Sequence, residues 1–299
     1  MTNCLAAFRI YVLDSYGCEL DRLTTSSFLV DTVLAAYGKY LFEKGSARYL
    51  YVYTVTAIQD RFPYLRRSLP ASWKVDGKWQ AQEPGECREV IPLALLKAMI
   101  SLALLWRWNI FAGCLMMGFS AMLHPSEFLT ASRRHLMLPK DMFIKMMHAY
   151  LHIPNPKTKR FARRQHAKID ENVVVAFLTF VFGQLDPGQP LWPASSAVFR
   201  KRWDVLLERL GVPTKTAQKG VTPGSLRGSG ATHFYLDCED IPRIAWRGRW
   251  SQVKTLEFYL QEVAAQVIFH RLPATSQTII ATLAEACDSL VYAVIQGVL

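Results

Sequence analysis

The sequence predicts a mainly α protein of the α+β kind, with one small antiparallel β-sheet or hairpin. Two observations predict this fold class. Apolar residues recur at three- and four-residue steps through most of the chain, as they do along the buried face of a helix. Short segments rich in bulky residues occur between residues 142 and 169, where a turn-forming run interrupts them.

Each helix is expected from its own apolar period. In the N-terminal part the pattern covers residues 27–44, where Gly45 ends it, and residues 47–62, which stop before Pro63. Further helices are predicted over 93–107, 110–123, 172–184, 197–210 and 276–298. The last of these carries an apolar stripe along one face, and Ser276 is expected as its N-cap.

The remaining elements follow from turn residues. Segments 142–147 and 150–153 are expected as β-strands before the turn run Pro154 to Lys159. Residues 68–92 contain three prolines and two glycines, which favour turns, so we interpret them as a linker. The chain then divides into a helical domain over residues 1–80 and a larger domain over residues 93–299.

Composition restricts the classes of function. The chain has 35 Lys and Arg residues against 24 Asp and Glu residues, a net charge of +11. Such an excess favours a polyanionic partner, because each phosphate contact releases bound counterions. The six cysteines form no Cys-x-x-Cys pair, which argues against a zinc site and a disulfide framework and suits a reducing compartment. No metal or other cofactor is therefore expected.

Neither secretion nor membrane insertion is predicted. The N-terminus lacks the charged, apolar and small-residue regions of a signal peptide. The most apolar tract, residues 108–123, has 16 residues without a charge, and a bilayer requires about 20. We interpret this tract as a buried helix and expect a soluble protein.

A basic run lies at the predicted hairpin. Its six cationic side chains, with no acid among them, are Lys157, Lys159, Arg160, Arg163, Arg164 and Lys168. A run that is not neutralised by nearby acids favours contact with a phosphate backbone over a merely solvated hairpin. Two more candidate contacts, Lys215 and Lys219, lie in a loop over residues 212–223.

Three residues near the C-terminus suggest phosphoryl chemistry. Arg227, Trp250 and Tyr259 follow one another at separations of 23 and 9 residues. A guanidinium binds two phosphate oxygens at once and stays protonated. An indole N–H can donate to a phosphate, although Trp250 could equally pack in the core beside Trp246. A phenol becomes a nucleophile when cations and a proton acceptor surround it.

This order and spacing resemble the C-terminal catalytic signature of the tyrosine recombinases, the phage-integrase-like enzymes that break and rejoin DNA. The segment LRGSGAT, which contains Arg227, is similar to the family's Leu-Arg-His-x-x-Ala-Thr at the start of a buried helix. Trp250 stands where the family has histidine or tryptophan. Tyr259 lies in a segment, 255–261, that resembles the helix of the family's nucleophile, and Lys157 resembles its hairpin lysine, with Lys159 as the alternative.

The resemblance implies an activity and a partner. Tyr259 would attack duplex DNA and form a 3′-phosphotyrosyl link, and Lys157 would protonate the leaving 5′ oxygen, without ATP or metal. Residues 1–80 would be a core-binding-like part of a DNA clamp. Helix 276–298 would join copies on DNA, or pack within its own chain. The sequence resembles those of recombinases from eukaryotic mobile elements, which implies DNA integration in the nucleus. For a prokaryotic chain, the expected location is the cytoplasm.

Two positions depart from the family pattern. In Leu123-His124-Pro125-Ser126-Glu127, His124 occupies the place of the family's first catalytic arginine. A histidine is mostly neutral at pH 7 and lacks the two-pronged geometry of a guanidinium. Gly224 occupies the place of a family histidine and has no side chain to handle a proton. Whether the chain is an enzyme therefore stays open.

Two other classes of function remain. One is a catalytically silent DNA-binding protein derived from a recombinase, which His124 and Gly224 favour. The other is a helical interaction module whose basic surface binds an acidic protein. The salt dependence of DNA affinity separates this last hypothesis from the first two, since phosphate contacts make affinity fall steeply with salt.

Overall fold

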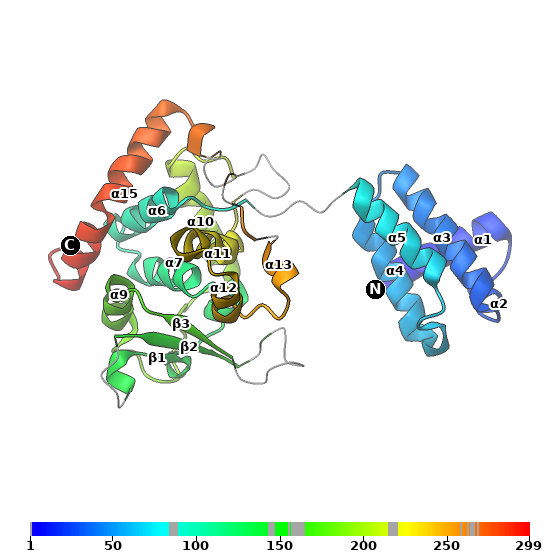
Figure 1. The fold of residues 1–299 in the computed structure, drawn as a ribbon, viewed down its shortest axis with the longest axis horizontal. Helices are drawn as coiled ribbons and strands as arrows, with labels where there is room; N and C mark the ends of the chain where they lie inside the picture. Colours follow the sequence, from blue (N-terminus) through cyan, green and yellow to red (C-terminus); the bar gives the residue numbers. More distant parts are fainter. Residues whose placement is uncertain are drawn as a thin grey trace. The chain divides into compact units, whose positions relative to one another are not determined.

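The computed structural model describes residues 2–83, 89–142, 147–154, 156, 165–214, 221–257, 259–261, 263, 267 and 269–299. The chain forms two compact units, Met1–Glu86 and Cys87–Leu299 (Figure 1). Helices make up most of both, and the described β structure is one three-stranded antiparallel sheet in the second unit. The predicted fold class, mainly α with a small antiparallel sheet, is confirmed.

The first unit is a helical bundle around an aromatic-rich core. Its elements are α1 (Thr2–Tyr16), α2 (Leu20–Leu23), α3 (Ser27–Glu43), α4 (Arg48–Arg61), the short 3₁₀ helix η1 (Pro63–Leu65) and α5 (Pro70–Gln82). Phe8, Leu34 and Tyr51 are fully buried at its centre. Helices α3 and α4 match the two predicted segments to within one or two residues. Helix α1 had no prediction, because apolar residues occur all around it.

The predicted linker over residues 68–92 is wrong where α5 lies. Pro70 occupies the first turn of that helix, a position where its fixed φ and missing N–H favour helix formation. The carboxylate of Asp31 on α3 accepts hydrogen bonds from the backbone N–H groups of Ala71 and Ser72, both at 2.8 Å. A buried side chain thus caps α5 from another helix, and Trp79 of α5 completes the core. Proline here begins a helix.

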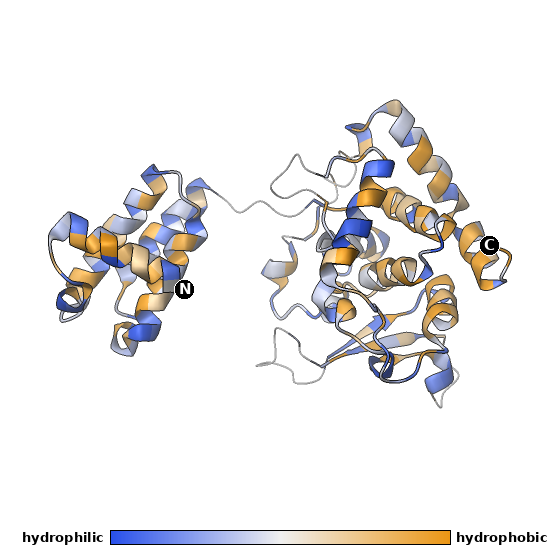
Figure 2. Cartoon of the chain, turned by 180° about the vertical axis from the view of Figure 1, so that it is seen from behind, coloured by the Kyte–Doolittle hydropathy of each residue, from blue (hydrophilic) through white to orange (hydrophobic). Residues whose placement is uncertain are grey.

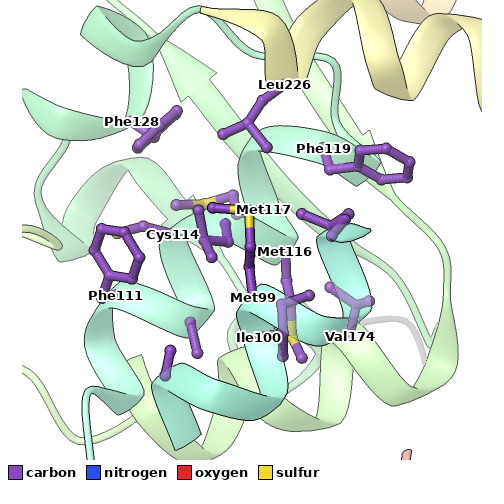
Figure 3. Close-up of a cluster of buried hydrophobic side chains, with 14 of the residues drawn as sticks. Met99, Ile100, Phe111, Cys114, Met116, Met117, Phe119, Phe128, Val174 and Leu226 are labelled. Atoms are coloured by element: carbon purple, nitrogen blue, oxygen red, sulfur yellow. The ribbon is translucent and has the colours of Figure 1, made fainter. Parts of the chain in front are cut away.

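The second unit contains most of the helices. They are α6 (Leu93–Leu105), α7 (Asn109–Ser120), α8 (Pro125–Leu129), α9 (Asn172–Phe182), α10 (Ser196–Arg209), α11 (Ser225–Cys238), α12 (Ile241–Gly248), α13 (Val253–Glu257) and α15 (Ala274–Ile295), with 3₁₀ turns η2 (Arg133–His135) and η3 (Pro139–Asp141). Helices α6 and α7 are apolar on nearly every side and run through the middle of the unit (Figures 1 and 2). Their side chains form the centre of the core, which Figure 3 shows around Met99, Cys114 and Met117.

The sheet lies beside these helices. Its strands are β1 (Leu136–Met137), β2 (Ala149–Ile153) and β3 (Gln165–Ile169), in the order β1-β2-β3. In β2 alternate residues are buried, so one face of the sheet covers the core. The β2–β3 register pairs Ile153 with Gln165. Of the predicted strand 142–147, residues 143–146 lie outside the described residues.

Glycines let α11 approach α7 closely. A Cβ added at Gly230 would overlap the carbonyl oxygen of Phe119 at the end of α7. A Cβ added at Gly118 would lie 2.9 Å from the side chain of Leu226. The first two turns of α11, Ser225 to Thr232, are consequently buried. This contact holds Arg227, which lies in the first turn of α11, next to the chain that follows α7.

Helix α15 packs within its own unit. Its buried stripe, which includes Ile280, Cys287 and Val291, lies against α6. Ser101 of α6 donates a hydrogen bond to the carbonyl of Leu283 at 2.7 Å. In the described part of the chain α15 alone has the length and apolar composition to cross a membrane, which core helices of soluble proteins share. The structure thus contains the contact of α15 with its own chain, and the joining of copies on DNA through this helix stays a prediction.

The predicted N-cap of this helix is wrong. Helix α15 begins at Ala274, with Pro273 at the N-cap position. Ser276 lies inside the first turn and is 8% exposed. Proline fixes the backbone before a helix without a side-chain hydrogen bond, so the N-cap lies three residues earlier than predicted.

We predict that Gly230→Ala destabilises the second unit. The added methyl group overlaps backbone that cannot rotate away, and overpacking of this kind costs about 1–3 kcal/mol. Urea unfolding measures the loss. Gly188→Ala is the matched control, because a Cβ there meets nothing within 4 Å. Equal stability of the two variants would contradict the close packing of α11 on α7.

Candidate functional site

A pocket of about 180 Å³ opens where α8, α11 and the segments after α12 and α13 meet. It is lined by His124, Glu127, Gln165, Arg227, Arg249, Trp250, Ser251, Gln252, Thr255 and Tyr259. Four residues singled out from the sequence for catalysis, His124, Arg227, Trp250 and Tyr259, are therefore together in one pocket. They come from positions up to 135 residues apart in the chain.

Arg227 is the most buried charge of the pocket, with 6% of its surface exposed. Its Nη1 donates to the carbonyl of Met122 at 2.7 Å, and its Nη2 donates to the carbonyl of Gly248 at 2.5 Å. Its Nε is buried and has no partner among the described residues. Burial first, and then the charge of Arg249, lower the pKa of Arg227 to about 10. The guanidinium is therefore still protonated at neutral pH.

Trp250 forms one wall of the pocket. The guanidinium carbon of Arg227 lies 4.3 Å from the centroid of its ring, a cation–π contact. The ring covers Gly248 so closely that a Cβ there would overlap it. Trp246, in contrast, is 86% exposed and packs in no core. Trp250 therefore packs against a small apolar cluster and also lines the pocket, without Trp246 beside it in that cluster.

Tyr259 faces Trp250 and α11. Its ring centroid is 5.3 Å from that of Trp250. The hydroxyl of Thr232 on α11 donates to the carbonyl of Tyr259 at 2.7 Å. A Cβ added at Gly228 would lie 3.1 Å from the Tyr259 ring. The helix that carries Arg227 thus also fixes the position of the tyrosine.

The helix expected around Tyr259 is shorter than predicted. Helix α13 ends at Glu257, and Tyr259 follows in a turn whose backbone N donates to the carbonyl of Leu256 at 2.7 Å. Leu256 is buried. The apolar contact anchors α13, and the turn that follows directs the chain back toward Thr232.

Arg249 enters the pocket from the end of α12. This helix closes with bonds from Arg249 N to Trp246 O (3.2 Å) and from Trp250 N to Ala245 O (2.9 Å), the pattern of a Schellman motif. Arg249 holds its left-handed position, with φ of 61°. Glycine is strongly preferred there, because a Cβ strains the left-handed conformation. No prediction assigned a role to this residue.

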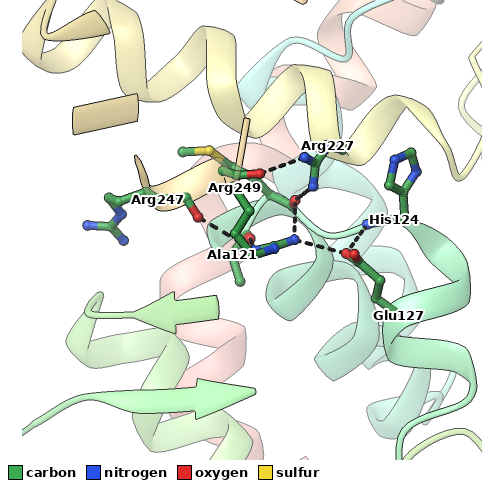
Figure 4. A network of polar contacts seen from close by, with 8 residues as sticks. Ala121, His124, Glu127, Arg227, Arg247 and Arg249 are labelled. Atoms are coloured by element: carbon green, nitrogen blue, oxygen red, sulfur yellow. Dashed lines mark hydrogen bonds and ion pairs between the residues drawn. The ribbon is translucent and has the colours of Figure 1, made fainter. Parts of the chain in front are cut away.

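The guanidinium of Arg249 lies beside that of Arg227 (Figure 4). Its Nη2 donates to Glu127 Oε2 at 2.9 Å and to the carbonyl of Met122 at 3.3 Å. The side chains of Arg249 and Glu127 are only 8% and 11% exposed. Burial lowers the pKa of Arg249, and the nearby Glu127 carboxylate opposes that effect. Two cations and one carboxylate thus share a largely buried site.

His124 begins α8 at the edge of this network. Its backbone N donates to Glu127 Oε2 at 2.8 Å, so the same oxygen receives both this bond and the bond from Arg249. The carboxylate caps the helix start and holds the arginine at once. The sequence drew attention to Glu127 only as part of a motif, and nothing in its spacing pointed to residue 249 as its partner.

An ion pair fixes α12 to the end of β3. Arg247 donates to both carboxylate oxygens of Asp170 at 2.7 Å. The hydrogen bond from Arg247 is the main reason that the pKa of Asp170 falls from 3.8 to about 2. Lys168 also pairs with Asp170, at 3.3 Å. Lys168 therefore has a partner within the fold, and its predicted contact with DNA stays a prediction.

Most of the predicted basic contacts cannot be placed. The residues Lys157, Lys159, Arg160, Arg163, Arg164, Lys215 and Lys219 lie outside the described residues. Gln165, which follows Arg164 in the chain, lines the pocket. Within the described part of the chain, no group of three His, Cys, Asp or Glu side chains could hold a metal ion.

Comparison with known proteins finds a distant structural likeness. No protein-family model and no curated protein matches the sequence. Among solved structures, the chain is similar to a crystal structure of XerA recombinase, with 13% sequence identity and a TM-score of 0.45. The match covers 91% of this chain and 99% of that one. At this distance the likeness does not show what the pocket does.

We predict that the Arg247–Asp170 pair stabilises the second unit in a pH-dependent way. Because the folded pKa of Asp170 is about 2 and the ordinary value is 3.8, the contribution is complete above pH 4 and disappears as the pH falls through 2. Arg247→Met should lower the free energy of unfolding by about 2 kcal/mol at pH 7. The difference from wild type should shrink between pH 4 and pH 2.

Urea unfolding across this pH range makes the measurement. Arg200→Met is the control, because its pair with Asp204 is exposed and contributes only about 0.3–0.5 kcal/mol. A difference for Arg247→Met that does not change with pH would contradict the assignment.

Proposed function

We propose that this chain binds duplex DNA and cleaves and rejoins one strand, with Tyr259 as the nucleophile and Arg227 as a phosphate-binding residue. The observation that carries the proposal is the shared pocket. A buried, protonated guanidinium and a phenol lie around one cavity, and Trp250 contacts both. The small volume of the cavity suits a single phosphate group.

The reaction follows from the chemistry of these groups. The phenol of Tyr259 loses its proton to solvent, its oxygen attacks the phosphorus atom to form a P–O bond, and the bond between phosphorus and the 5′ oxygen breaks. The 5′ oxygen takes up a proton and leaves as a hydroxyl. The pentacoordinate transition state carries extra negative charge on its non-bridging oxygens, which Arg227 stabilises. The same steps in reverse rejoin the strand, because the tyrosyl phosphodiester retains the energy of the original bond.

Lys157 completes the proposal as the acid that protonates the leaving oxygen, with Lys159 as the alternative. This role comes from the resemblance to tyrosine recombinases. It is supported by the sequence position of both lysines, close before Gln165, which lines the pocket. An ammonium group on a flexible stem suits a general acid.

The net charge of +11 supports DNA as the partner. In this proposal, residues 1–80 form a helical DNA-binding domain and residues 93–299 the catalytic domain. Assembly of several copies on DNA, action on mobile elements and nuclear location are further parts of the proposal that come from the resemblance alone.

A second function has a specific observation in its favour. His124 begins α8 where the family has its first catalytic arginine, and Gly224 precedes α11 where the family has a histidine. A chain without these groups could bind DNA and leave it intact. The two functions differ in one measurable product, a covalent link between protein and DNA.

The test is covalent trapping on nicked duplex DNA of random sequence. We expect an adduct that resists SDS for the wild-type chain and none for Tyr259→Phe, because the phenol oxygen forms the bond. Arg227→Ala should slow adduct formation by about 10³-fold, by analogy with arginines in other phosphoryl transfers. Tyr292→Phe is the control, since Tyr292 is exposed on α15 and absent from the pocket.

Salt separates the outcomes further. DNA affinity that falls steeply with salt, together with no adduct, would favour the silent DNA-binding protein. Affinity that hardly changes with salt would remove nucleic acid as the partner. An adduct that forms equally with Tyr259→Phe would show that another nucleophile acts.

A further inference from the structure

We infer that Arg249 is a second phosphate-binding residue of the pocket, acting beside Arg227 on the same phosphate group. The inference rests on the proposed function for the identity of the anion. It assigns to α12 a guanidinium that would compensate for the histidine at position 124. Four observations support it: charge, backbone strain, hydrogen-bonding capacity and the position of Glu127.

The first observation is the net positive charge of a buried site. The guanidinium groups of Arg227 and Arg249 both donate to the carbonyl of Met122, so two cations meet at one acceptor. Glu127 supplies one negative charge between them. Among the described residues of the pocket, these three side chains together carry a net positive charge. Burying a charge without a partner is unfavourable, and a bound oxyanion would remove this imbalance.

The second observation is the backbone at Arg249. This residue holds the left-handed position that ends α12, with φ of 61°. Glycine would occupy it without strain, and Gly248 stands only one residue earlier. Strained positions of this kind cost of order 1 kcal/mol or more and cluster at functional sites. An arginine stands here despite the strain, which points to a use for its side chain.

The third observation is the spare hydrogen-bonding capacity of Arg227. Its Nη atoms bind the carbonyls of Met122 and Gly248. Within the described chain, Nε of Arg227 is buried without a partner. A guanidinium has five N–H donors, so the bonds to Met122 and Gly248 leave Arg227 with donors for a ligand in the pocket that it lines together with Arg249.

The fourth observation is the position of Glu127. Its carboxylate binds the backbone N of His124 at 2.8 Å and the side chain of Arg249 at 2.9 Å. An arginine at the end of α12 is thereby held at the start of α8, beside the histidine. The pocket has two guanidinium groups although position 124 supplies none.

The test uses the full chain with Glu127 and Arg249 changed together. Glu127→Gln with Arg249→Gly removes one negative and one positive charge, so the net charge of the pocket stays the same. Glycine also relieves the strain at position 249. If Glu127 and Arg249 form a purely structural ion pair, the double variant keeps its affinity for phosphate. If Arg249 binds phosphate, the double variant loses affinity. Arg243→Gln, which removes an exposed cation from the same helix, is the control.

Two readouts are measured. The first is the affinity for inorganic phosphate, measured by isothermal titration calorimetry. We expect the double variant to bind phosphate about 10- to 100-fold more weakly than wild type, as for loss of a charge-assisted hydrogen bond. The second is the rate of adduct formation on nicked DNA, which should fall by a larger factor, because charge on the phosphate increases in the transition state.

A second measurement follows the wild-type chain and does not use the double variant. Nitrogen-15 NMR of arginine Nε–H groups should show two signals that move together as phosphate is added. Their assignment comes from their loss in Arg227→Lys and Arg249→Lys. Movement of the Arg227 signal alone would overturn the inference.

The outcomes distinguish this inference from the proposed function. If the wild type binds phosphate through both arginines but forms no adduct, Arg249 is a phosphate-binding residue and strand cleavage is wrong. If the double variant binds phosphate and forms the adduct like wild type, the proposed function stands and the inference about Arg249 is overturned.

Discussion

The site depends on the packing that brings two arginines to one carbonyl, that of Met122. Met122 follows α7 in a left-handed conformation, with φ of 50°. Its carbonyl accepts from Arg227 on α11 and from Arg249 at the end of α12 (Figure 4). The close contact of α11 with α7 through Gly230 places Arg227 at this carbonyl. The Schellman ending of α12 places Arg249 there. The two guanidinium groups, Tyr259 and the Trp250 ring are then arranged around this one point.

The surrounding fold keeps this arrangement rigid. Thr232 binds the backbone of Tyr259, and Arg247 ties α12 to β3 through Asp170. These contacts use helix ends and turns, which leave backbone groups free to bond with side chains. The proposed phosphate chemistry would need its donors placed before the substrate arrives. The small second-unit elements, α8, α12 and α13, provide that placement while the large apolar helices α6 and α7 provide stability.

The sequence predicted the parts of this account that depend on periodicity and spacing. Helical periods gave the fold class, and the distances between Arg227, Trp250 and Tyr259 marked residues that do share a pocket. Arg249 was missed, because its importance comes from a left-handed backbone and a contact with Glu127, and neither has a periodic signal. A non-glycine residue just after Gly248 was the available sign. Residues 70–82 were misread because Pro70 begins a helix that Asp31, 40 residues away, caps.

The central claim is that the oxygen of Tyr259 becomes joined to a DNA phosphate. Mass spectrometry of the protease-digested adduct tests it most directly. The account predicts that the nucleotide is attached to the peptide of residues 255–271, at Tyr259. Attachment to any other residue, or a chain that forms no covalent product with DNA, would contradict it.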